Sequence, residues 1–561
     1  MDKNTIIGFV LIGLILILWP LYQREIIGEK TAAPTQEQTE EAAPSPSFSR
    51  VTPIEAEPTR VTPAPSLEAI ALPPDADRPD TVVIENALFR AELSSRGGGT
   101  VLSWKLKTFE RYEIDVLTGE TVKVPIDLIP DFGRADNLGF RMTLPDGTEH
   151  DLAHTVFEMT ETDAQGARFE KKITGKGRII REIRTGPDRF DIDVRTRFVS
   201  ERETPGRSWV RVNWKTGLSP TEKNVRDEDA YHQAFALQGG ELLKEKKGDT
   251  GVREGATDWM ALRNKYFIMA MIPEKNGSAV QLAAQRERIR VNDFSGNQVD
   301  WKNFHCALYL DSDTGTPETV FRLFLGPLEY NLLKAYDVKL EKTMDFGWAI
   351  IRVFSIPLYH ALAFLGRVLG NYGLAIIVLS ILIKAVLYPL TRKSYQSMRD
   401  MQALQPKVAA LKEKYAKDPQ RLNQETMKIY KEHGVNPMGG CLPMLLQMPV
   451  LFALFSLFRS TIMFRQATFG PIHDLSAPDG LIPIGATAIH ILPILMGITT
   501  MLQQKQTVQD PKQKMMAYFM PIFLTFIFYR MSAGLNLYYL MFNLLTIAQE
   551  HLVRRSKAKG A

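Results

Sequence analysis

Apolar runs long enough to cross a lipid bilayer constrain the fold of this 561-residue chain more than any other feature. A helix of about 20 predominantly apolar residues spans the hydrocarbon core. Such runs are concentrated after about residue 345, whereas the preceding part of the chain is largely polar. They predict an α-helical membrane core with five spans, at residues 371–390, 443–464, 481–502, 515–530 and 533–550.

A further apolar run, Thr5–Tyr22, lies close to the first residue and has two interpretations. It is either a cleaved signal peptide or an uncleaved membrane anchor. We favour an anchor over residues 1–24, because the run exceeds a typical signal-peptide core and no small-x-small cleavage site directly follows it. The expected total is therefore six spans, with both termini on the same side of the membrane.

Two apolar segments need a different interpretation from a simple span. Phe346–Leu369 contains Arg352, Pro357 and Arg367, so we expect residues 341–370 to form an amphipathic helix in the membrane interface. The block at residues 515–549 would be roughly 50 Å long as one helix, which exceeds a hydrocarbon core of about 30 Å. We therefore expect it to break near Arg530, Ser532 and Gly534 into a hairpin of two spans.

The distribution of Lys and Arg among the loops predicts the orientation. Residues 391–442 contain ten Lys or Arg residues, residues 503–514 contain three and the basic tail 551–561 contains four. Residues 464–480 contain only one. Because basic loops stay in the cytoplasm, both termini are expected there, and the large polar region is expected to be exported from a multi-pass membrane protein. A net charge of +5 over this length, without a basic aromatic patch, gives no indication of specific nucleic-acid binding.

The exported region divides into a linker and a folded domain. Residues 25–80 are rich in Pro, Ala, Thr and Glu, which is typical of a disordered tether. Residues 81–340 show short alternating segments separated by turn pairs such as Asp146-Gly147 and Asn276-Gly277, which predicts an all-β sandwich ending in a helix over 317–334. The clearest predicted strands are Thr81–Ile84, Phe190–Phe198, Trp209–Trp214 and Ser278–Leu282.

Catalytic and metal-binding patterns are weak in this sequence. The two cysteines, Cys306 and Cys441, exclude a disulfide framework, and the nine histidines lack ligand spacing, so we predict no metal and no cofactor. The Gly97-Gly98-Gly99 run indicates a bend rather than a phosphate-binding loop, because no Lys-Ser/Thr pair follows it. We therefore do not expect an enzyme.

The charged segment 391–442 predicts a cytoplasmic hairpin of two helices, Ser394–Tyr415 and Gln420–His433, interrupted at residues 417–419. The alternative is a solvated loop without fixed structure. A methionine-bearing stripe beside basic residues also suits a partner, because methionine surfaces adapt to varied apolar ligands. The residues expected to bind that partner are Met398, Met401, Leu404, Lys412 and Lys414.

Lys384 is the one charged residue inside the apolar run Asn371–Leu390. A cation at the centre of a membrane helix costs about 2.5 to 3.5 kcal/mol on insertion scales, so such residues usually face water or a polar partner. Snorkelling is the other interpretation, since Leu390 lies only roughly 9 Å further along the helix. Ser380 precedes Lys384 by one turn on the same face.

The segment Tyr430–Pro449, with the sequence YKEHGVNPMGGCLPMLLQMP, resembles the signature of the YidC membrane protein insertases, which are relatives of the mitochondrial and chloroplast insertases. The order of anchor, exported β domain, interfacial helix, five-span core and cytoplasmic hairpin is also similar to the Gram-negative form of this family. Supporting blocks are Leu387–Leu390, Leu404–Pro406, Ile472–Ala477, Asp510-Pro511, Met520-Pro521 and Ala533–Tyr539.

The resemblance implies a chaperone-like insertase for nascent inner-membrane proteins, acting alone or with the Sec translocon, and an exported domain similar to the galactose-mutarotase β super-sandwich. It also implies a hydrophilic groove with one arginine, whose place Lys384 takes. Lysine, unlike arginine, loses its proton readily when desolvated, so this groove is expected to stay wet. The implied groove residues are Lys384, Ser380, Gln447, Tyr538 and Tyr539, although Ser and Gln also commonly join helices and Tyr commonly marks an interface.

The partners implied are nascent membrane proteins, membrane lipids, the Sec translocon, the ribosome and the signal-recognition particle or its receptor. The short basic tail makes strong ribosome binding through that tail doubtful. Two functions from other classes are the alternatives. A membrane-anchored carbohydrate-active enzyme would bind or epimerise sugars, and a solute transporter would show inverted repeats, which are not visible in this sequence.

Overall fold

The computed structural model describes most of the chain after residue 77. The predicted N-terminal anchor and nearly all of the predicted linker lie outside the described residues, as do Cys441 and the last three residues of the basic tail. The described range is 78–558, with gaps at residues 115–119, 133, 135–136, 202–206, 247–250, 285–287, 294–295, 313–317, 417, 436–441, 485–486 and 508–510.

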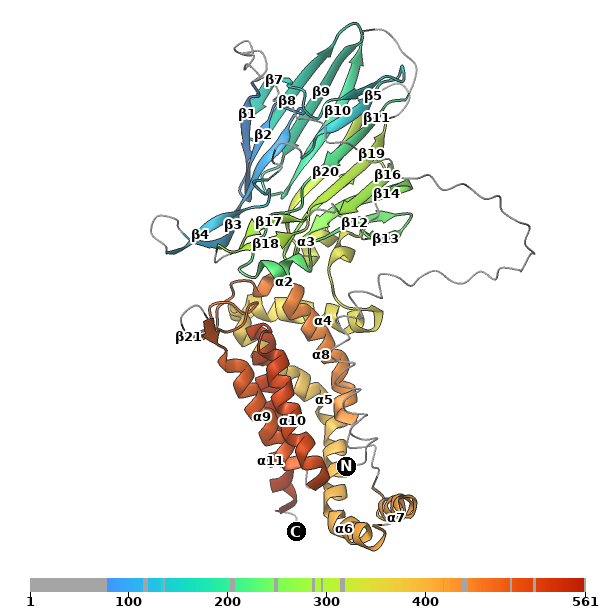
Figure 1. The fold of residues 1–561 in the computed structure, drawn as a ribbon, viewed down its shortest axis with the longest axis vertical. Helices are drawn as coiled ribbons and strands as arrows, with labels where there is room; N and C mark the ends of the chain where they lie inside the picture. The colour runs from blue at the N-terminus through green and yellow to red at the C-terminus, as the bar shows by residue number, and fades with distance from the viewer. Residues whose placement is uncertain are drawn as a thin grey trace, which may run out of the picture. The chain divides into compact units, whose positions relative to one another are not determined.

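The first part of the described chain consists of antiparallel sheets (Figure 1). One sheet has four strands in the order β1 (Thr81–Glu85), β2 (Phe89–Ser94), β3 (Thr100–Ile114) and β4 (Thr121–Asp127). A small sheet pairs β17 (Ile289–Asn292) with β18 (Gln298–Trp301). The large sheet has fourteen strands, namely β5 (Phe140–Thr143), β6 (Glu149–Asp151), β7 (Glu158–Asp163), β8 (Gly166–Ile173), β9 (Gly177–Thr185), β10 (Asp191–Ser200), β11 (Trp209–Trp214), β12 (Gln233–Gln238), β13 (Glu241–Lys244), β14 (Val252–Arg263), β15 (Phe267–Pro273), β16 (Gly277–Ala284), β19 (Phe304–Asp311) and β20 (Glu318–Pro327).

Alternation along the strands explains why these segments form sheets. In β10, Ile192, Val194 and Phe198 are buried, whereas Arg195 and Arg197 point to solvent. A period of two places every second side chain on one face of a strand. The strands predicted from this pattern are confirmed, with bounds that shift by at most two residues.

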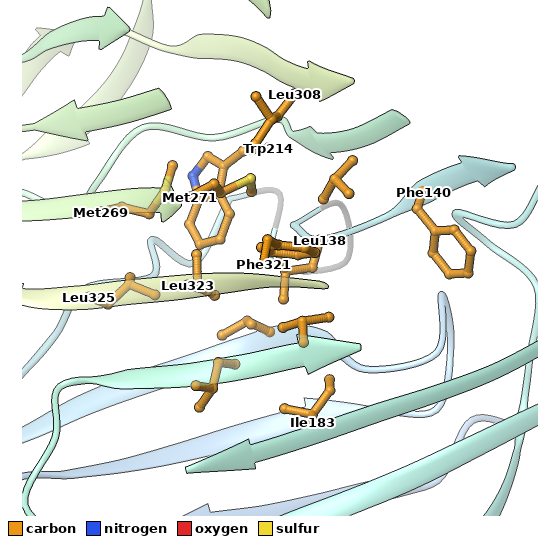
Figure 2. Packing of buried hydrophobic residues seen from close by; sticks show 14 of the residues in the cluster. Leu138, Phe140, Ile183, Trp214, Met269, Met271, Leu308, Phe321, Leu323 and Leu325 are labelled. Atoms are coloured by element: carbon orange, nitrogen blue, oxygen red, sulfur yellow. The ribbon is translucent and has the colours of Figure 1, made fainter. Parts of the chain in front are cut away.

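Side chains from both larger sheets share one hydrophobic core. Phe89 and Trp104 of the four-stranded sheet stack with ring centroids 3.9 Å apart. Figure 2 shows part of the same core, where Trp214, Met271 and Phe321 project from three strands of the large sheet. A β-rich sandwich is therefore correct, although one of its sheets is much larger than the other.

Two local predictions in this domain have different outcomes. Gly97, Gly98 and Gly99 all have positive φ between β2 and β3, which confirms the bend. The helix predicted over 317–334 is wrong for most of its length, because β20 occupies Glu318–Pro327 and only α3 (Tyr330–Lys334) is helical. Residues 318–327 form a strand because they pair with β10 on one side and with β15 on the other.

The second part of the described chain is helical, beginning with η2 (Leu340–Thr343) and α4 (Ala349–Leu369). Among the described residues, two helical stretches are long and apolar enough to cross a membrane, Ala349–Leu369 and Tyr372–Pro389. The segment predicted to lie in the interface thus also satisfies the length and hydropathy of a span. Its interfacial placement stays a prediction.

Helix α5 (Tyr372–Ala403) extends beyond the predicted span at 371–390 and forms the first part of the predicted hairpin. The single helix predicted over Ser394–Tyr415 is divided, because α6 (Gln405–Lys414) begins anew at Leu404. Pro406 explains the break, since proline has no N–H with which to continue the hydrogen bonding of α5 and is tolerated in the first turn of a new helix. The next helix, α7 (Pro419–Glu432), begins at the predicted interruption, where the Asp418 side chain caps it.

The remaining helices differ from the predicted spans mainly at their ends. The stretch 481–502 does not begin as a helix, because β21 (Ile482–Ile484) pairs with β22 (Thr487–Ile489) and α9 (Ile491–Thr507) starts afterwards. The block 515–549 is broken into a hairpin as predicted, and its second helix continues through most of the predicted tail. The other elements are α8 (Leu442–Ser460), η4 (Ile462–Phe464), α10 (Pro511–Phe528) and α11 (Ala533–Ala558), and Figure 1 shows α9, α10 and α11 running side by side.

Candidate functional site

Lys384 lies on α5 and is almost completely buried, with 7% of its surface exposed. The helix begins at Asn371, whose side-chain oxygen accepts a hydrogen bond from the backbone N–H of Leu374 at 3.0 Å. Such a cap satisfies one of the N–H groups that a helix start leaves unpaired. Lys384 then follows about 18 Å further along the axis, well inside the apolar part of the helix.

The ammonium group of Lys384 is held by α11. It donates a hydrogen bond to the Thr546 hydroxyl, with 2.7 Å between Nζ and Oγ1. The Thr546 hydroxyl in turn donates to the Phe542 carbonyl oxygen at 2.8 Å, so its oxygen is left to accept from the lysine. The ammonium also lies 4.4 Å from the centre of the Phe542 ring, where the negative face of the ring attracts a cation.

Ser380 is fully buried one helical turn before Lys384. Its hydroxyl donates to the backbone carbonyl of Ile376 at 2.7 Å, a bond that serines in helices often make. Residues four apart lie on the same face of a helix, so the structure agrees with the predicted adjacency of Ser380 and Lys384. The oxygen of Ser380 still has a lone pair with which to accept another hydrogen bond.

The two tyrosines of the predicted groove lie on α11, further from the lysine. Tyr538 is completely buried, and its hydroxyl has no hydrogen-bond partner among the described residues. The Tyr538 ring lies 6.1 Å from the Phe542 ring, and the Phe542 ring in turn contacts the Lys384 ammonium. Tyr539 is half-buried and packs edge-on against Phe528 at 5.0 Å.

Gln447, the remaining predicted groove residue, lies on α8 and is half-buried. The contacts described above connect Lys384 to α11 and do not include Gln447. The structure therefore brings Lys384, Ser380 and, through Phe542, Tyr538 into one region, whereas a shared site with Gln447 stays a prediction.

The polar face of α11 is the feature that the sequence analysis missed. Asn543, Thr546 and Gln549 are all buried and recur every three residues. This spacing places them on one side of a helix, so polar periodicity in an apolar run was a usable signal. In membrane helices such side chains commonly form interhelical hydrogen bonds.

The other two members of this face join α11 to neighbouring helices. The Asn543 amide donates to the hydroxyls of Thr500 at 2.8 Å and Thr499 at 3.3 Å, both on α9. The Gln549 amide nitrogen donates to the Thr391 hydroxyl of α5 at 3.4 Å. The polar face of α11 thus bonds to α9 through Asn543 and to α5 through Thr546 and Gln549.

The predicted partner-binding residues form a second group at the hairpin. Leu404 and Val408 are buried and Met401 is half-buried, so the stripe is partly covered within this chain. The side chain of Met398 lies outside the described residues. Lys412 is half-buried and Lys414 is exposed in the last turn of α6, where cations also suit the helix dipole. Among the four of these residues whose side chains the structure describes, only Lys414 is exposed.

Two arginines contact acidic residues of the β-rich domain, Arg459 near the end of the predicted span 443–464 and Arg465 directly after that span. The guanidinium of Arg465 donates to Glu222 at 2.6 Å, and Arg459 donates to Asp227 at 3.4 Å. Arg465 is almost completely buried, with 4% of its side chain exposed. These residues therefore pair with acids and do not simply point to solvent.

Family models match nearly the whole described chain. The family described as YidC periplasmic domain matches residues 81–361, and the family described as 60Kd inner membrane protein matches residues 364–560. The chain belongs to the YidC family of membrane protein insertases. It is thus an inner-membrane protein with a β-rich periplasmic domain, as the resemblance of the segment Tyr430–Pro449 indicated.

Full-length YidC relatives agree with this assignment. The membrane protein insertase YidC of Chlorobium luteolum is 36% identical and aligns with 100% of this chain and 96% of its own length. That of Pelodictyon phaeoclathratiforme is 33% identical over 99% of this chain and 95% of its own length. These relatives are named insertases, not enzymes or solute transporters.

Solved structures resemble this chain more weakly. The active YidC insertase with its first transmembrane domain resolved is 17% identical, covers 83% of this chain and 91% of its own, and has a TM-score of 0.35. A putative aldose 1-epimerase from Escherichia coli K12 covers 45% of this chain and all of its own at 10% identity, with a TM-score of 0.27. Neither score carries an argument, so the likeness of the periplasmic domain to mutarotases stays an expectation.

No metal site is apparent in the part of the chain that the structure describes, where no group of three or more His, Cys, Asp or Glu residues could hold an ion. Cys306 is buried in the β-rich core, and burial raises the pKa of its thiol to about 12. A thiol in this environment is a poor nucleophile, because the thiolate is the reactive form.

Proposed function

We propose that this chain inserts and helps fold nascent inner-membrane proteins, alone or with the Sec translocon, through a polar site at Lys384. One observation carries the proposal. A buried ammonium on α5 is held by a hydroxyl and an aromatic ring of α11, deep in an apolar helix. Ionisable residues in membrane helices are costly, and they commonly mark the path of a substrate or ion.

The chemistry of this site suits an acidic or polar flank of an entering segment. A carboxylate makes a stronger hydrogen bond to an ammonium than a hydroxyl does, so it replaces Thr546 as the partner of Lys384. The apolar part of the segment then moves along the neighbouring helices into lipid. Each buried CH₂ contributes about 0.8 kcal/mol, so burial provides the overall drive and the ion pair sets orientation and rate.

The proposed topology has six spans with both termini in the cytoplasm. The ten Lys and Arg residues in the segment 391–442 support this orientation, together with the basic tail. The cytoplasmic hairpin then meets the ribosome, the signal-recognition particle or its receptor through Lys412 and Lys414. The proposed environment of the substrate also includes membrane lipids and the other groove residues, which are Ser380, Gln447, Tyr538 and Tyr539.

Crosslinking from position 384 tests whether the substrate reaches this site. A photoreactive amino acid at position 384 is expected to capture a stalled nascent membrane protein, whereas the same probe at exposed Lys105 in the periplasmic domain is expected to capture none. Capture at neither position, or equally at both, would contradict the proposal.

Insertion by the purified full-length chain in vesicles of phosphatidylethanolamine and phosphatidylglycerol tests the role of the charge. Lys384→Ala is expected to slow insertion of a test protein with a short acidic tail, and Lys384→Arg to preserve it. Lys105→Ala removes a lysine far from the site and is the matched control. Unchanged insertion by Lys384→Ala would remove Lys384 from the mechanism.

A further inference from the structure

Glu550 is a second charged residue on the face of α11 that holds Lys384. It follows Thr546 by four residues, and residues at this spacing are neighbours on one helix face. Its side chain is half-buried, and its carboxylate interacts electrostatically with the Lys384 ammonium. The hydroxyl that binds the lysine and the acid that attracts it therefore come from successive turns of one helix.

An unsatisfied acceptor lies beside these two residues. Gln549 is buried, with 6% of its surface exposed, and its amide nitrogen donates to Thr391 of α5. Its amide oxygen has no hydrogen-bond partner among the described residues. A buried carbonyl group without a donor costs free energy, so this position favours an occupant that supplies an N–H group. An extended polypeptide has such groups at every residue except proline.

We propose that Glu550 is a resident counter-charge of Lys384, which an acidic flank must displace, and that it thereby limits the preference of the site for acidic over neutral segments. This inference rests on the proposed function and names a residue that determines its specificity. Two carboxylates compete for one ammonium and repel each other, whereas a neutral flank meets no such repulsion. Glu550 also lies nearer than Thr546 to the C-terminal end of α11, which is the side from which a substrate enters in the proposed topology.

The test compares two substrates in reconstituted vesicles of phosphatidylethanolamine and phosphatidylglycerol that contain the full-length chain. The substrates are single-span proteins whose short tails differ only in carrying two Asp or two Asn residues. Glu550→Gln is expected to raise the rate for the Asp tail relative to the Asn tail by about threefold to tenfold at low salt. Glu550→Asp keeps the charge and is expected to leave this ratio near the wild-type value.

Two controls separate this effect from general changes of charge or folding. Asp400→Asn removes one negative charge from an exposed position on α5 and is expected to leave the ratio unchanged. In a Lys384→Gln background, Glu550→Gln is expected to change the ratio less than it does in the wild type, because the two carboxylates then no longer compete for one ammonium. A ratio that does not change in Glu550→Gln, or changes equally in Asp400→Asn, would overturn the inference.

The outcomes also distinguish this inference from the proposed function. If Lys384→Ala slows insertion while Glu550→Gln leaves the ratio unchanged, the proposed site at Lys384 is supported and the proposed role of Glu550 is contradicted. If Lys384→Ala has no effect on either substrate, the proposed site itself is wrong, and the role of Glu550 falls with it. A change in the ratio of the same size with and without Lys384 would show that Glu550 acts by direct repulsion alone and not as the counter-charge of Lys384.

Discussion

The Lys384 ammonium lies 2.7 Å from the Thr546 hydroxyl, so a charge carried by one apolar helix is held by another helix 162 residues later in the chain. Thr546 is completely buried, and its own hydrogen is directed to the Phe542 carbonyl. The position of the cation is therefore fixed by the packing of α5 against α11. Changes to Thr546 should affect both stability and the proposed substrate site.

Replacing Thr546 with valine removes this acceptor with little change of shape. We expect Thr546→Val to lower the free energy of unfolding by about 1 kcal/mol, since interhelical hydrogen bonds in membranes contribute about 0.6 to 2 kcal/mol. Thermal unfolding of the full-length chain in detergent measures the change. Thr546→Ser keeps the hydroxyl and should retain most of the stability, and a larger loss in Thr546→Ser than in Thr546→Val would argue that the methyl group, not the hydrogen bond, is important.

A close contact near the start of α5 predicts a steric effect at Gly373. A β-carbon at this position would lie 2.2 Å from Cγ of Phe469, far inside normal contact distance. Gly373→Ala should therefore destabilise the chain by about 1 to 3 kcal/mol through overpacking. In a Phe469→Ala background the ring is absent, and the same substitution should cost much less. An equal cost in both backgrounds, measured by thermal unfolding, would exclude the ring as the cause.

Glu228 in α2 (Val225–Asp229) predicts a pH dependence of the periplasmic domain. Its side chain is buried and accepts hydrogen bonds from Thr221, and burial together with the charge of Glu222 raises its pKa to about 7. Between the ordinary glutamate value of 4.5 and about 7, the folded chain keeps a proton that the unfolded chain has lost. Unfolding then releases a proton, so stability should fall as the pH rises through this window.

Glu228→Gln tests this expectation, because an amide does not titrate. Its melting temperature should fall less steeply than that of the wild type between about pH 5 and pH 8. Glu158→Gln, at an exposed position on β7, is the matched control and should keep the wild-type slope. If the slope of Glu228→Gln equals that of the wild type, another buried group causes the pH dependence.

The basic end of α6 predicts a contribution to partner recruitment. We expect the double substitution Lys412→Gln and Lys414→Gln to weaken ribosome binding by the full-length chain about fivefold at low salt, because attraction between opposite surface charges increases encounter. Cosedimentation with translating ribosomes measures the effect. Arginine at both positions should preserve binding. Equal binding by all three proteins at low salt would remove these lysines from the interface.

Local patterns predicted several elements correctly. Alternation of apolar and polar residues identified β10 and β11, because the period of two places every second side chain on the same face of a strand. The interruption at residues 417–419 marked the start of α7, and the structure shows that the Asp418 side chain caps this helix. The signature Tyr430–Pro449 indicated the family, which the matches to the rest of the chain confirmed.

Other features depended on residues that are distant in sequence. An apolar run predicted a helix from Leu481, but the helix α9 starts at Ile491, where the Asp479 carboxylate accepts from the backbone N–H groups of Ile491 and Leu492. The first residues that hydropathy assigned to the span instead form the paired strands β21 and β22. Hydropathy measures preference for lipid and cannot distinguish a helix from a short hairpin of the same composition.

The sequence by itself determined the division into a β-rich and a helical region, the family, and the presence of a cation, Lys384, inside an apolar run. Composition and periodicity are properties of neighbouring residues, so these conclusions needed no tertiary information. Only the tertiary structure decided what surrounds that cation. Thr546, Phe542 and Glu550 come to Lys384 because α11 packs against α5, and a hydrogen bond or a charge pair depends on distance in space, which hydropathy and local spacing along the chain do not give.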